Sequence, residues 1–374
     1  MQAMNTLAEI IRTDAAQRGV LPFARFMELA LYHPELGYYE TQRHNPGRRG
    51  DFYTSVSTGE FFGQLLAFQF SEWLDGIKAV HPQIKTLHLI EAGAHDGTLA
   101  ADILKWIQSS RPDLFAQIEY RIIEPSPRRQ QWQKETLRPF APRVRWFSHF
   151  NDLPALRSNG IIFSNELLDA FPVHRYGWDA KNKNWFEWGV TAEHGKFIWA
   201  RMPQTHDTSH ITRQLPRLPR LPSELFDVLP DGYTIEASPA AEKWWRQAAG
   251  ILDSGWVMTI DYGLTSGELF MPGRAHGTLR SYSRHRAGDD LLASPGEQDI
   301  TAHVNFSVIR NAGQESGLIT EFFGTQAEFL VEILTNATRT NAFGEWDTTR
   351  TRQFQTLTHP DHLGRAFHAL VQTR

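Results

Sequence analysis

The stretch that most constrains this chain is a short apolar run followed by a glycine-bearing turn and an amphipathic segment. The run Leu87–Ala92 has the composition of a buried strand, and the turn after it carries Gly93 and Gly97. From Leu99 to Ile107 apolar residues return at helical spacing, so the stretch predicts a strand, a tight turn and a helix. A turn of this kind brings bare backbone and a helix N-terminus close to a ligand.

A second apolar segment beyond this helix ends in the acid Glu124. An acid at the end of the second strand is the placement expected of a ribose-hydroxyl acceptor, and it indicates an adenosine-containing small molecule bound at the carboxyl ends of parallel strands. The pattern departs from a full G-x-G-x-x-G, because His95 stands between Gly93 and Gly97 where a glycine would be usual. An ordinary βα turn, with Glu124 as a solvated strand end, stays open as the alternative.

Composition bounds the class of protein. The chain has 374 residues, 41% of them hydrophobic and 21% charged, which indicates a soluble globular protein of one large domain with insertions, or of two domains. A net charge of −4 gives no global attraction to nucleic acid, so no nucleic-acid partner is expected. No apolar run approaches the roughly 20 residues that span a bilayer, and the first residues lack a signal-peptide stretch. The absence of cysteine excludes disulfides and thiolate chemistry, and it favours a cytoplasmic location.

Beyond residue 85 strands and helices alternate, which predicts an α/β domain with a parallel sheet covered on both faces. We place a helical N-terminal region with a covering loop at 1–84 and the core at 85–374, with an insertion at about 171–237. Tryptophan and phenylalanine around Gly and Asn turns predict an antiparallel hairpin in the insertion. Near the end we expect a strand at 318–323, a helix at 325–334 and a final amphipathic helix through His368.

Carboxylates follow several of the predicted strands. Glu91, Glu124, Glu166 and Asp261 lie at or beside strand ends, which places them on the sheet edge where open α/β sheets bind ligands. Any one of them alone would be a solvated terminus. The pair Asn165 and Glu166 either caps a helix or presents an amide and a carboxylate to an amine or guanidinium substrate. No His-Glu-x-x-His pattern, nucleophile elbow or Walker loop occurs, so no metal site is expected and hydrolase and phosphoryl-transfer functions are disfavoured.

Ordered blocks across almost the whole chain resemble those of one known family. They include His33-Pro34-x-x-Gly37-Tyr38-Tyr39, Gly50-Asp51-Phe52-Tyr53-Thr54-Ser55, Glu91-x-Gly93-x-x-x-Gly97-Thr98-Leu99, Glu124-x-Ser126-Pro127, Asn165-Glu166-x-x-Asp169-Ala170-x-Pro172-Val173-His174-Arg175, Ile260-Asp261-Tyr262-Gly263 and Pro295-Gly296-Glu297-x-Asp299-Ile300-Thr301. With these blocks the sequence resembles the MidA-like class I S-adenosylmethionine-dependent methyltransferases, a family that includes a mitochondrial complex I assembly factor that methylates a protein arginine.

The resemblance implies a Rossmann-like, seven-stranded methyltransferase sheet with a reversed final hairpin. It implies S-adenosyl-L-methionine as cofactor, contacted by Glu91, Gly93, Ala94, Gly97, Thr98, Glu124, Ser126, Asp51, Tyr53 and Thr54. It also places Asn165, Glu166 and Asp169 at the acceptor. Glu166 would hold a guanidinium bidentately, and Asp169 or Asp51 would take the proton. Two positions depart from the family, since His95 replaces a usual glycine and Asp96 a usual arginine, and the imidazole could weaken cofactor binding.

Three functions therefore stay open. The chain is a protein-arginine methyltransferase acting on a respiratory-complex subunit or a similar protein, a weakly active or inactive S-adenosylmethionine-binding assembly factor, or a nucleotide-dependent oxidoreductase that shares only the sheet. The third is disfavoured because the third glycine of the dinucleotide pattern is missing. Apolar surface on the insertion would also allow a homodimer.

Overall fold

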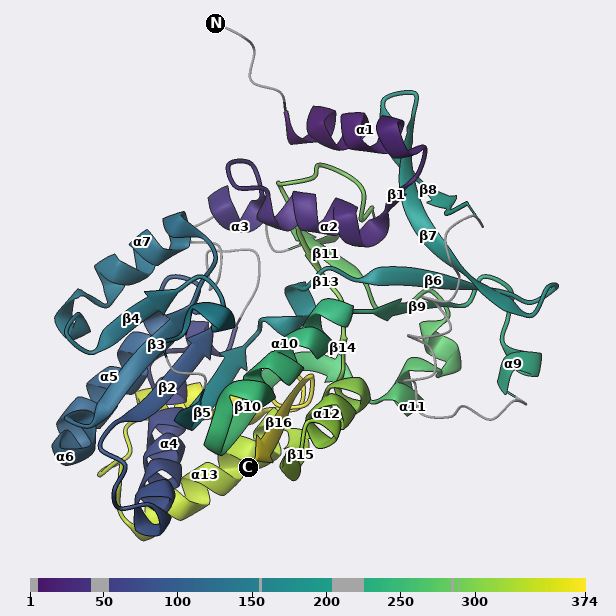
Figure 1. Cartoon of the computed structure of the whole chain (residues 1–374). Helices are drawn as coiled ribbons and strands as arrows, with labels where there is room; N and C mark the ends of the chain where they lie inside the picture. The colour runs from purple at the N-terminus through teal and green to yellow at the C-terminus, as the bar shows by residue number, and fades with distance from the viewer. Residues whose placement is uncertain (1–5, 42–53, 155–156, 204–224, 284–285, 289) are drawn as a thin grey trace, which may run out of the picture. The chain divides into compact units, whose positions relative to one another are not determined.

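The computed structural model of the chain (Figure 1) describes residues 6–41, 54–154, 157–203, 225–283, 286–288 and 290–374. Its chain divides into two compact units, each assembled from three separate segments of the sequence. The first unit consists of residues 1–45, 169–243 and 263–309, and the second of residues 46–168, 244–262 and 310–374. Most of the predicted site residues belong to the second unit.

The largest sheet has eight strands, and all of them except β14 lie mainly in the second unit. Its strand order is β15-β16-β10-β5-β2-β3-β4, with the short β14 beside the end of β10. The strands are β2 (Leu87–Ala92), β3 (Ile118–Ile123), β4 (Val144–Phe147), β5 (Ser158–Asn165), β10 (Leu252–Leu264), β14 (Val304–Asn305), β15 (Ile319–Thr325) and β16 (Phe367–Thr373). From β4 to β10 the strands run parallel, whereas β16 is antiparallel to both β10 and β15. The seven-stranded sheet with a reversed final hairpin is therefore confirmed.

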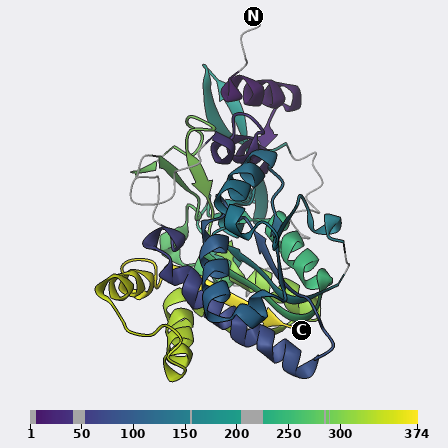
Figure 2. The same ribbon diagram turned by 90° about the vertical axis from the view of Figure 1, so that its left-hand side faces the viewer.

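Helices cover both faces of this sheet. They are α4 (Phe61–Val80), α5 (Thr98–Ser110), α6 (Pro112–Phe115), α7 (Pro127–Thr136), α10 (Pro239–Ile251), α12 (Phe306–Glu315), α13 (Gln326–Arg339) and α14 (Thr348–Thr358). On one face the ring of Phe70 in α4 lies 4.9 Å from that of Phe163 in β5. On the other face the Trp245 indole of α10 donates to the Gln372 side chain at 2.7 Å. Figure 1 shows α10 in front of the strands, and Figure 2 shows α4 and α13 side by side.

Local sequence signals explain where the helices begin. Gly97 adopts a left-handed φ of 87° directly before α5, a conformation that costs glycine nothing. Ser126 accepts a hydrogen bond from a backbone N–H in the first turn of α7, and Pro127 is its first residue, as expected of an N-cap followed by N1 proline. Thr325 forms a capping box at the start of α13. Each of these junctions fixes how the chain leaves a strand and enters a helix.

The first unit contains the N-terminal helices and the antiparallel insertion. Its main elements are α1 (Leu7–Arg18), β1 (Leu21–Pro22), α2 (Phe23–Tyr32), α3 (Tyr38–Thr41), β6 (His174–Asp179), β7 (Asn184–Glu193), β8 (Lys196–Arg201), α9 (Leu225–Val228), β9 (Thr234–Ala237), α11 (Ser266–Leu269), β11 (Arg280–Ser283), β12 (Arg286–Gly288) and β13 (Asp299–Thr301). The predicted antiparallel hairpin is confirmed, because β6, β7 and β8 pair antiparallel in succession. Trp199 of β8 packs on Phe23 of α2, with ring centroids 4.8 Å apart.

The predicted final helix through His368 is wrong. Helix α14 ends at Thr358, two residues before Pro360, which cannot continue a helix. Residues 367–373 instead form β16 between β10 and β15. Since this strand is covered on both faces, its apolar residues are nearly continuous and give no clear two-residue alternation.

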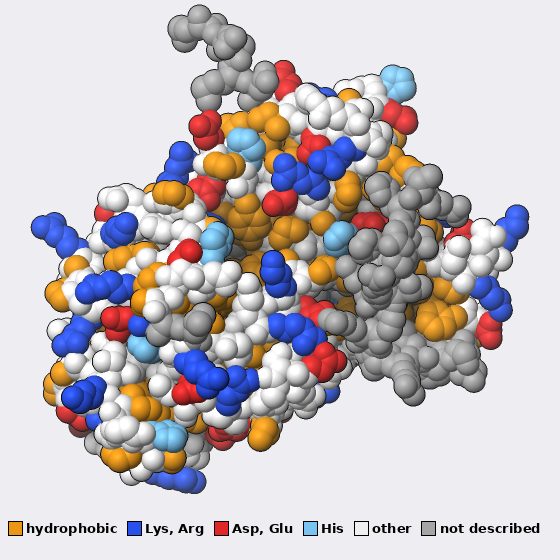
Figure 3. Space-filling model, viewed as in Figure 1, with side chains coloured by type: hydrophobic (Ala, Val, Ile, Leu, Met, Phe, Trp, Pro, Cys, Tyr) orange, Lys and Arg blue, Asp and Glu red, His pale blue; other side chains and the backbone are white. Residues whose placement is uncertain are grey.

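Two surface properties bear on possible partners. None of the described helices has the length and apolar composition that a membrane span requires. On the face shown in Figure 3, acidic and basic side chains lie interspersed, and its described residues form no continuous basic patch of the kind that nucleic acid requires.

Candidate active site

The turn between β2 and α5 has the strained backbone that its glycines predict. Gly93 and Gly97 have φ values of 76° and 87°, and His95 between them has a φ of 45°. The N–H of Gly97 donates to the carbonyl of Ala94 at 2.7 Å, which closes the turn. His95 thus adopts the left-handed conformation expected of the glycine it replaces, at a cost of roughly 1–2 kcal/mol.

The residues after His95 are joined by side-chain hydrogen bonds at the start of α5. The Asp96 carboxylate accepts from both the N–H and the hydroxyl of Thr98, at 3.0 and 2.8 Å, so it caps α5. Burial would raise the pKa of Asp96, but the His95 ring, whose Nδ1 lies 3.8 Å from Oδ1, and the two hydrogen bonds from Thr98 outweigh it and lower the pKa to about 2. Asp96 is therefore ionised, and the polar groups of Thr98 are already engaged within the chain.

Glu91 lies buried near the end of β2. The residue is 2% exposed, and its carboxylate accepts a 2.6 Å hydrogen bond from the hydroxyl of Tyr120 in β3. Burial raises the pKa of Glu91 to about 7, although the Tyr120 hydroxyl partly opposes this shift. A carboxylate in this state has a strong preference for a nearby positive charge.

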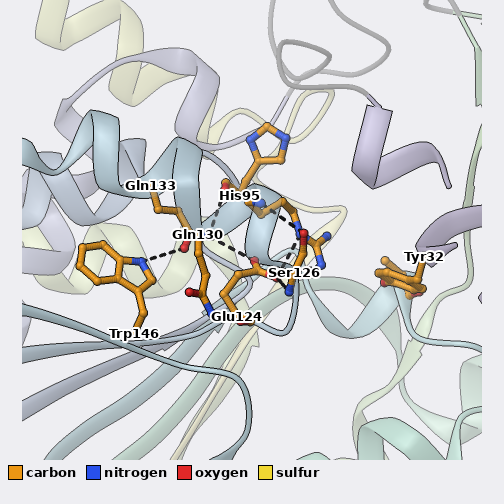
Figure 4. Close-up of polar contacts among 9 residues, drawn as sticks. Tyr32, His95, Glu124, Ser126, Gln130, Gln133 and Trp146 are labelled. Atoms are coloured by element: carbon orange, nitrogen blue, oxygen red, sulfur yellow. Dashed lines mark hydrogen bonds and ion pairs between the residues drawn. The ribbon is translucent and has the colours of Figure 1, made fainter. Parts of the chain in front are cut away.

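Glu124, directly after β3, lies in a dense polar network (Figure 4). Its Oε1 accepts from the N–H of Ser126 at 2.9 Å and from the Arg129 guanidinium at 2.9 and 3.0 Å. Its Oε2 accepts from the Gln133 amide at 3.1 Å, the only described partner of that oxygen. Because a carboxylate oxygen has two lone pairs, Oε2 keeps one acceptor position for a ligand hydroxyl.

Gln133 forms hydrogen bonds to residues that follow both β2 and β3. The same amide nitrogen donates to the carbonyl of His95 at 3.0 Å, and the amide oxygen accepts from the Trp146 indole at 3.0 Å. In Figure 4 the His95 imidazole points away from Glu124 while its carbonyl faces Gln133. Gln133 and Arg129 were not predicted from the sequence, where their only signal is their position on the helix that follows Glu124.

A second strained turn holds Glu166 after β5. Glu166 has a φ of 52°, and its N–H donates to the carbonyl of Ile260 in β10 at 2.9 Å. Asp261, fully buried, accepts from the N–H groups of Leu167 and Leu168 at 3.1 and 2.8 Å. The predicted carboxylate Asp261 therefore shapes this turn through its hydrogen bonds to the backbone.

The Glu166 carboxylate is oriented through one of its oxygens. Oε1 accepts from the N–H of Ser55 at 3.1 Å and from the Asn165 amide at 3.0 Å. Burial raises the pKa of Glu166 to about 7, which the bonds from Ser55 and Asn165 partly oppose and the charge of Asp261 reinforces. Within the described residues, Oε2 of Glu166 has no hydrogen-bond partner, and Oδ1 of Asn165 is buried without one.

The remaining predicted site residues have other positions. Asp169 belongs to the first unit, where its carbonyl accepts from the N–H of Ala302 at 2.9 Å. Thr54 exchanges hydrogen bonds with Ser57. Asp51 and Tyr53 lie outside the described residues. Among the described residues no group of histidines and carboxylates is arranged to hold a metal ion.

These residues fit the nucleoside cofactor that the resemblance implies. A Cβ at Gly93 would lie 2.8 Å from a methyl of Leu167, so the bare backbone of the turn approaches the residue after Glu166 closely. The turn after β2 therefore packs closely against the turn after β5. Glu124 offers a free lone pair for a ribose hydroxyl, and the buried Glu91 lies at the same sheet edge as the unpaired oxygens beside β5.

Comparisons with known proteins identify the family of the chain. Residues 65–324 match the model of a family of S-adenosyl-L-methionine-dependent methyltransferases. A crystal structure of a Burkholderia thailandensis protein bound to S-adenosyl-homocysteine is 32% identical, with a TM-score of 0.82 over 98% of this chain and 92% of that one. The mitochondrial protein arginine methyltransferase NDUFAF7 of Homo sapiens is 26% identical over 79% of this chain and 66% of its own. Its Drosophila melanogaster homolog is 26% identical over 83% of this chain and 71% of its own.

One expectation is overturned by these relatives. The cytoplasmic location predicted from the absence of cysteine is wrong, since the similar proteins from Drosophila and Homo sapiens are mitochondrial. Absence of cysteine excludes disulfides but does not distinguish one reducing compartment from another.

The family match covers most of the chain and includes both strand ends that form the glycine turn and the Glu124 network. It agrees with the fold, in which the parallel strands end at buried carboxylates. This protein belongs to the family of S-adenosyl-L-methionine-dependent methyltransferases.

Proposed function

We propose that this methyltransferase transfers a methyl group to a guanidinium nitrogen of a protein arginine. The observation that carries the proposal is the pair of acceptor oxygens beside β5, Oε2 of Glu166 and Oδ1 of Asn165, which lack partners in the described part of the chain. Relatives named as protein arginine methyltransferases support the same acceptor.

A guanidinium complements these two oxygens. It carries five N–H donors in a planar fork and no acceptor, so a carboxylate and an amide oxygen can each accept from it. With Oε1 held by Ser55 and Asn165, the carboxylate of Glu166 has a defined orientation that leaves Oε2 for the substrate. The arrangement positions the acceptor before reaction, which is the main requirement of a displacement reaction.

The ionisation of Glu166 also suits a positively charged substrate. With a pKa of about 7, the Glu166 carboxyl exists in both its protonated and its ionised form near neutral pH. Approach of a positive guanidinium favours the ionised form. The carboxylate then draws the positive charge toward the nitrogens it contacts and leaves the attacking nitrogen more nucleophilic.

We place the cofactor site at the carboxyl ends of β2 and β3. When bound, S-adenosylmethionine supplies an electrophilic methyl group on a sulfonium. We assign its contacts to Glu91, Gly93, Ala94, Gly97, Thr98, Glu124 and Ser126, with Asp51, Tyr53 and Thr54 as further predicted contacts. Glu124 would bind a ribose hydroxyl through Oε2, and the buried Glu91 would favour the positive end of the cofactor. Asp169 or Asp51 would accept the proton that the methylated nitrogen releases.

The weakly active assembly factor of the sequence analysis has less support. That alternative depends on obstruction by His95, whose backbone has a left-handed φ that glycine also adopts and whose ring points away from Glu124. A homodimer stays a prediction, to be measured by light scattering of the purified protein.

Replacing Glu166 by Gln tests the function. The variant keeps the shape of the side chain but cannot carry the negative charge, so turnover with an arginine peptide should fall at least about tenfold. Binding of S-adenosylmethionine in calorimetry should stay within about twofold of the native value. Glu332→Gln, on the exposed surface of α13, is the matched control and should change neither quantity. Unchanged turnover in Glu166→Gln would remove Glu166 from the mechanism.

A further inference from the structure

The carboxylate of Glu166 is oriented by a residue far away in the sequence. Ser55 precedes the short helix η1 (Val56–Thr58) and is fully buried. Its N–H donates to Oε1 of Glu166 at 3.1 Å, and its hydroxyl donates to Oε1 of Gln326 at 2.8 Å. One residue therefore connects the carboxylate to the first residue of α13.

Gln326 is itself fixed in position. It is fully buried, and its amide nitrogen donates to the carbonyl of Leu357 in the last turn of α14 at 2.9 Å. This second bond determines which end of the amide faces Ser55, because only the oxygen can accept from the Ser55 hydroxyl. The capping box of Thr325 and Glu328 anchors the backbone of Gln326 at the start of α13.

The downstream end of the same segment is held by α14. The side chain of Gln353 accepts from the N–H of Phe61 at 3.1 Å. A Cβ at Gly59, whose φ is 132°, would lie 2.2 Å from the Gln353 amide nitrogen, so the helix and the segment are in close contact. Gln326 and Gln353 therefore fix the two ends of residues 55–61, but only Gln326 contacts the residue that reaches Glu166.

We propose that Gln326 is a positioning residue for methyl transfer, which holds the Ser55 N–H against the Glu166 carboxylate through the Ser55 hydroxyl. This inference rests on the proposed function of Glu166. Without the Gln326 acceptor, the buried Ser55 hydroxyl must find another partner, and the segment shifts away from its present position. Oε1 of Glu166 then keeps only the bond from Asn165, and the direction of Oε2 is less defined.

The test is a double-mutant cycle between Gln326→Met and Glu166→Gln, measured on the full chain with an arginine peptide. Methionine keeps the length of glutamine but makes neither hydrogen bond. In the native background Gln326→Met should lower kcat about tenfold. In the Glu166→Gln background it should cost less than about twofold, because the group that it positions is already absent.

The pH profile of kcat/KM separates positioning from a merely structural role. Loss of the Ser55 bond removes a contact that lowers the pKa of Glu166. The acid limb of the profile should therefore move to higher pH in Gln326→Met. The matched control is Gln353→Met, which loosens the other end of the segment and should leave the acid limb in place.

The outcomes distinguish the two hypotheses. Equal losses from Gln326→Met in both backgrounds, or an unmoved acid limb, would overturn the positioning role while leaving Glu166 in the mechanism. If Glu166→Gln alone has no effect on turnover, the proposed function fails first. Should Gln326→Met not fold, Ser55→Ala breaks the same connection from the other side, and the same cycle applies.

Discussion

The partly buried carboxyl of Glu166 should make the stability of the protein depend on pH. Its pKa is near 7 in the folded chain, raised from 4.5 mainly by burial. Since one pKa unit corresponds to about 1.36 kcal/mol, ionisation of Glu166 costs the folded state about 3 kcal/mol. The folded chain holds this proton more tightly than the unfolded chain, so the contribution to stability is fully present below pH 4.5 and is lost as the pH rises through 7.

Glu166→Gln removes this dependence. About 2 of the 3 kcal/mol should be lost between pH 5.5 and pH 8. The free energy of unfolding of the native protein, measured relative to Glu166→Gln, should therefore fall by about 2 kcal/mol across this interval. Glu91 has a similarly raised pKa, but it is present in both proteins and cancels in the difference.

The assay is urea denaturation at both pH values, followed by the fluorescence of the 12 tryptophans. Glu332→Gln, which removes a carboxyl from the exposed face of α13, should run parallel to the native protein. If the free energies of unfolding of the native protein and of Glu166→Gln differed by the same amount at pH 5.5 and at pH 8, the raised pKa would be refuted. If the native protein instead gained stability relative to Glu166→Gln as the pH rises, Glu166 would have to be paired with a cation.

Two further predictions concern the cofactor end of the site. Gln133→Leu removes the amide that joins Glu124 to the carbonyl of His95, so the dissociation constant for S-adenosylmethionine in calorimetry should rise about tenfold; an unchanged constant would show that this connection does not shape the site. His95→Gly relieves a left-handed conformation that glycine tolerates freely, and the same dissociation constant should stay within about threefold of the native value. Binding more than about tenfold tighter would show that the imidazole obstructs the cofactor.

Much of the fold could be predicted because its signals are local. The glycine turn after Leu87–Ala92 and the alternation of strands and helices both depend on residues that are close in the sequence. The strand β16 could not be read in this way, because burial on both faces removes its alternation and its partners β10 and β15 are distant in the sequence.

The same distinction between local and long-range signals applies to the residues of the candidate site. Glu91, Glu124 and Glu166 could be predicted because strand ends of a parallel sheet share one edge. The groups that orient them could not, since Ser55 and Gln326 reach Glu166 across long stretches of sequence. Such hydrogen bonds depend on tertiary packing and leave no periodic pattern in the sequence.

The most direct test of the account is to locate the transferred methyl group by mass spectrometry. The enzyme is incubated with isotopically labelled S-adenosylmethionine and matched peptides in which a single position is arginine or lysine. Label is expected on the guanidinium of the arginine peptide, at a rate that depends on Glu166. Label on lysine instead, or label on arginine at the same rate in Glu166→Gln, would contradict it.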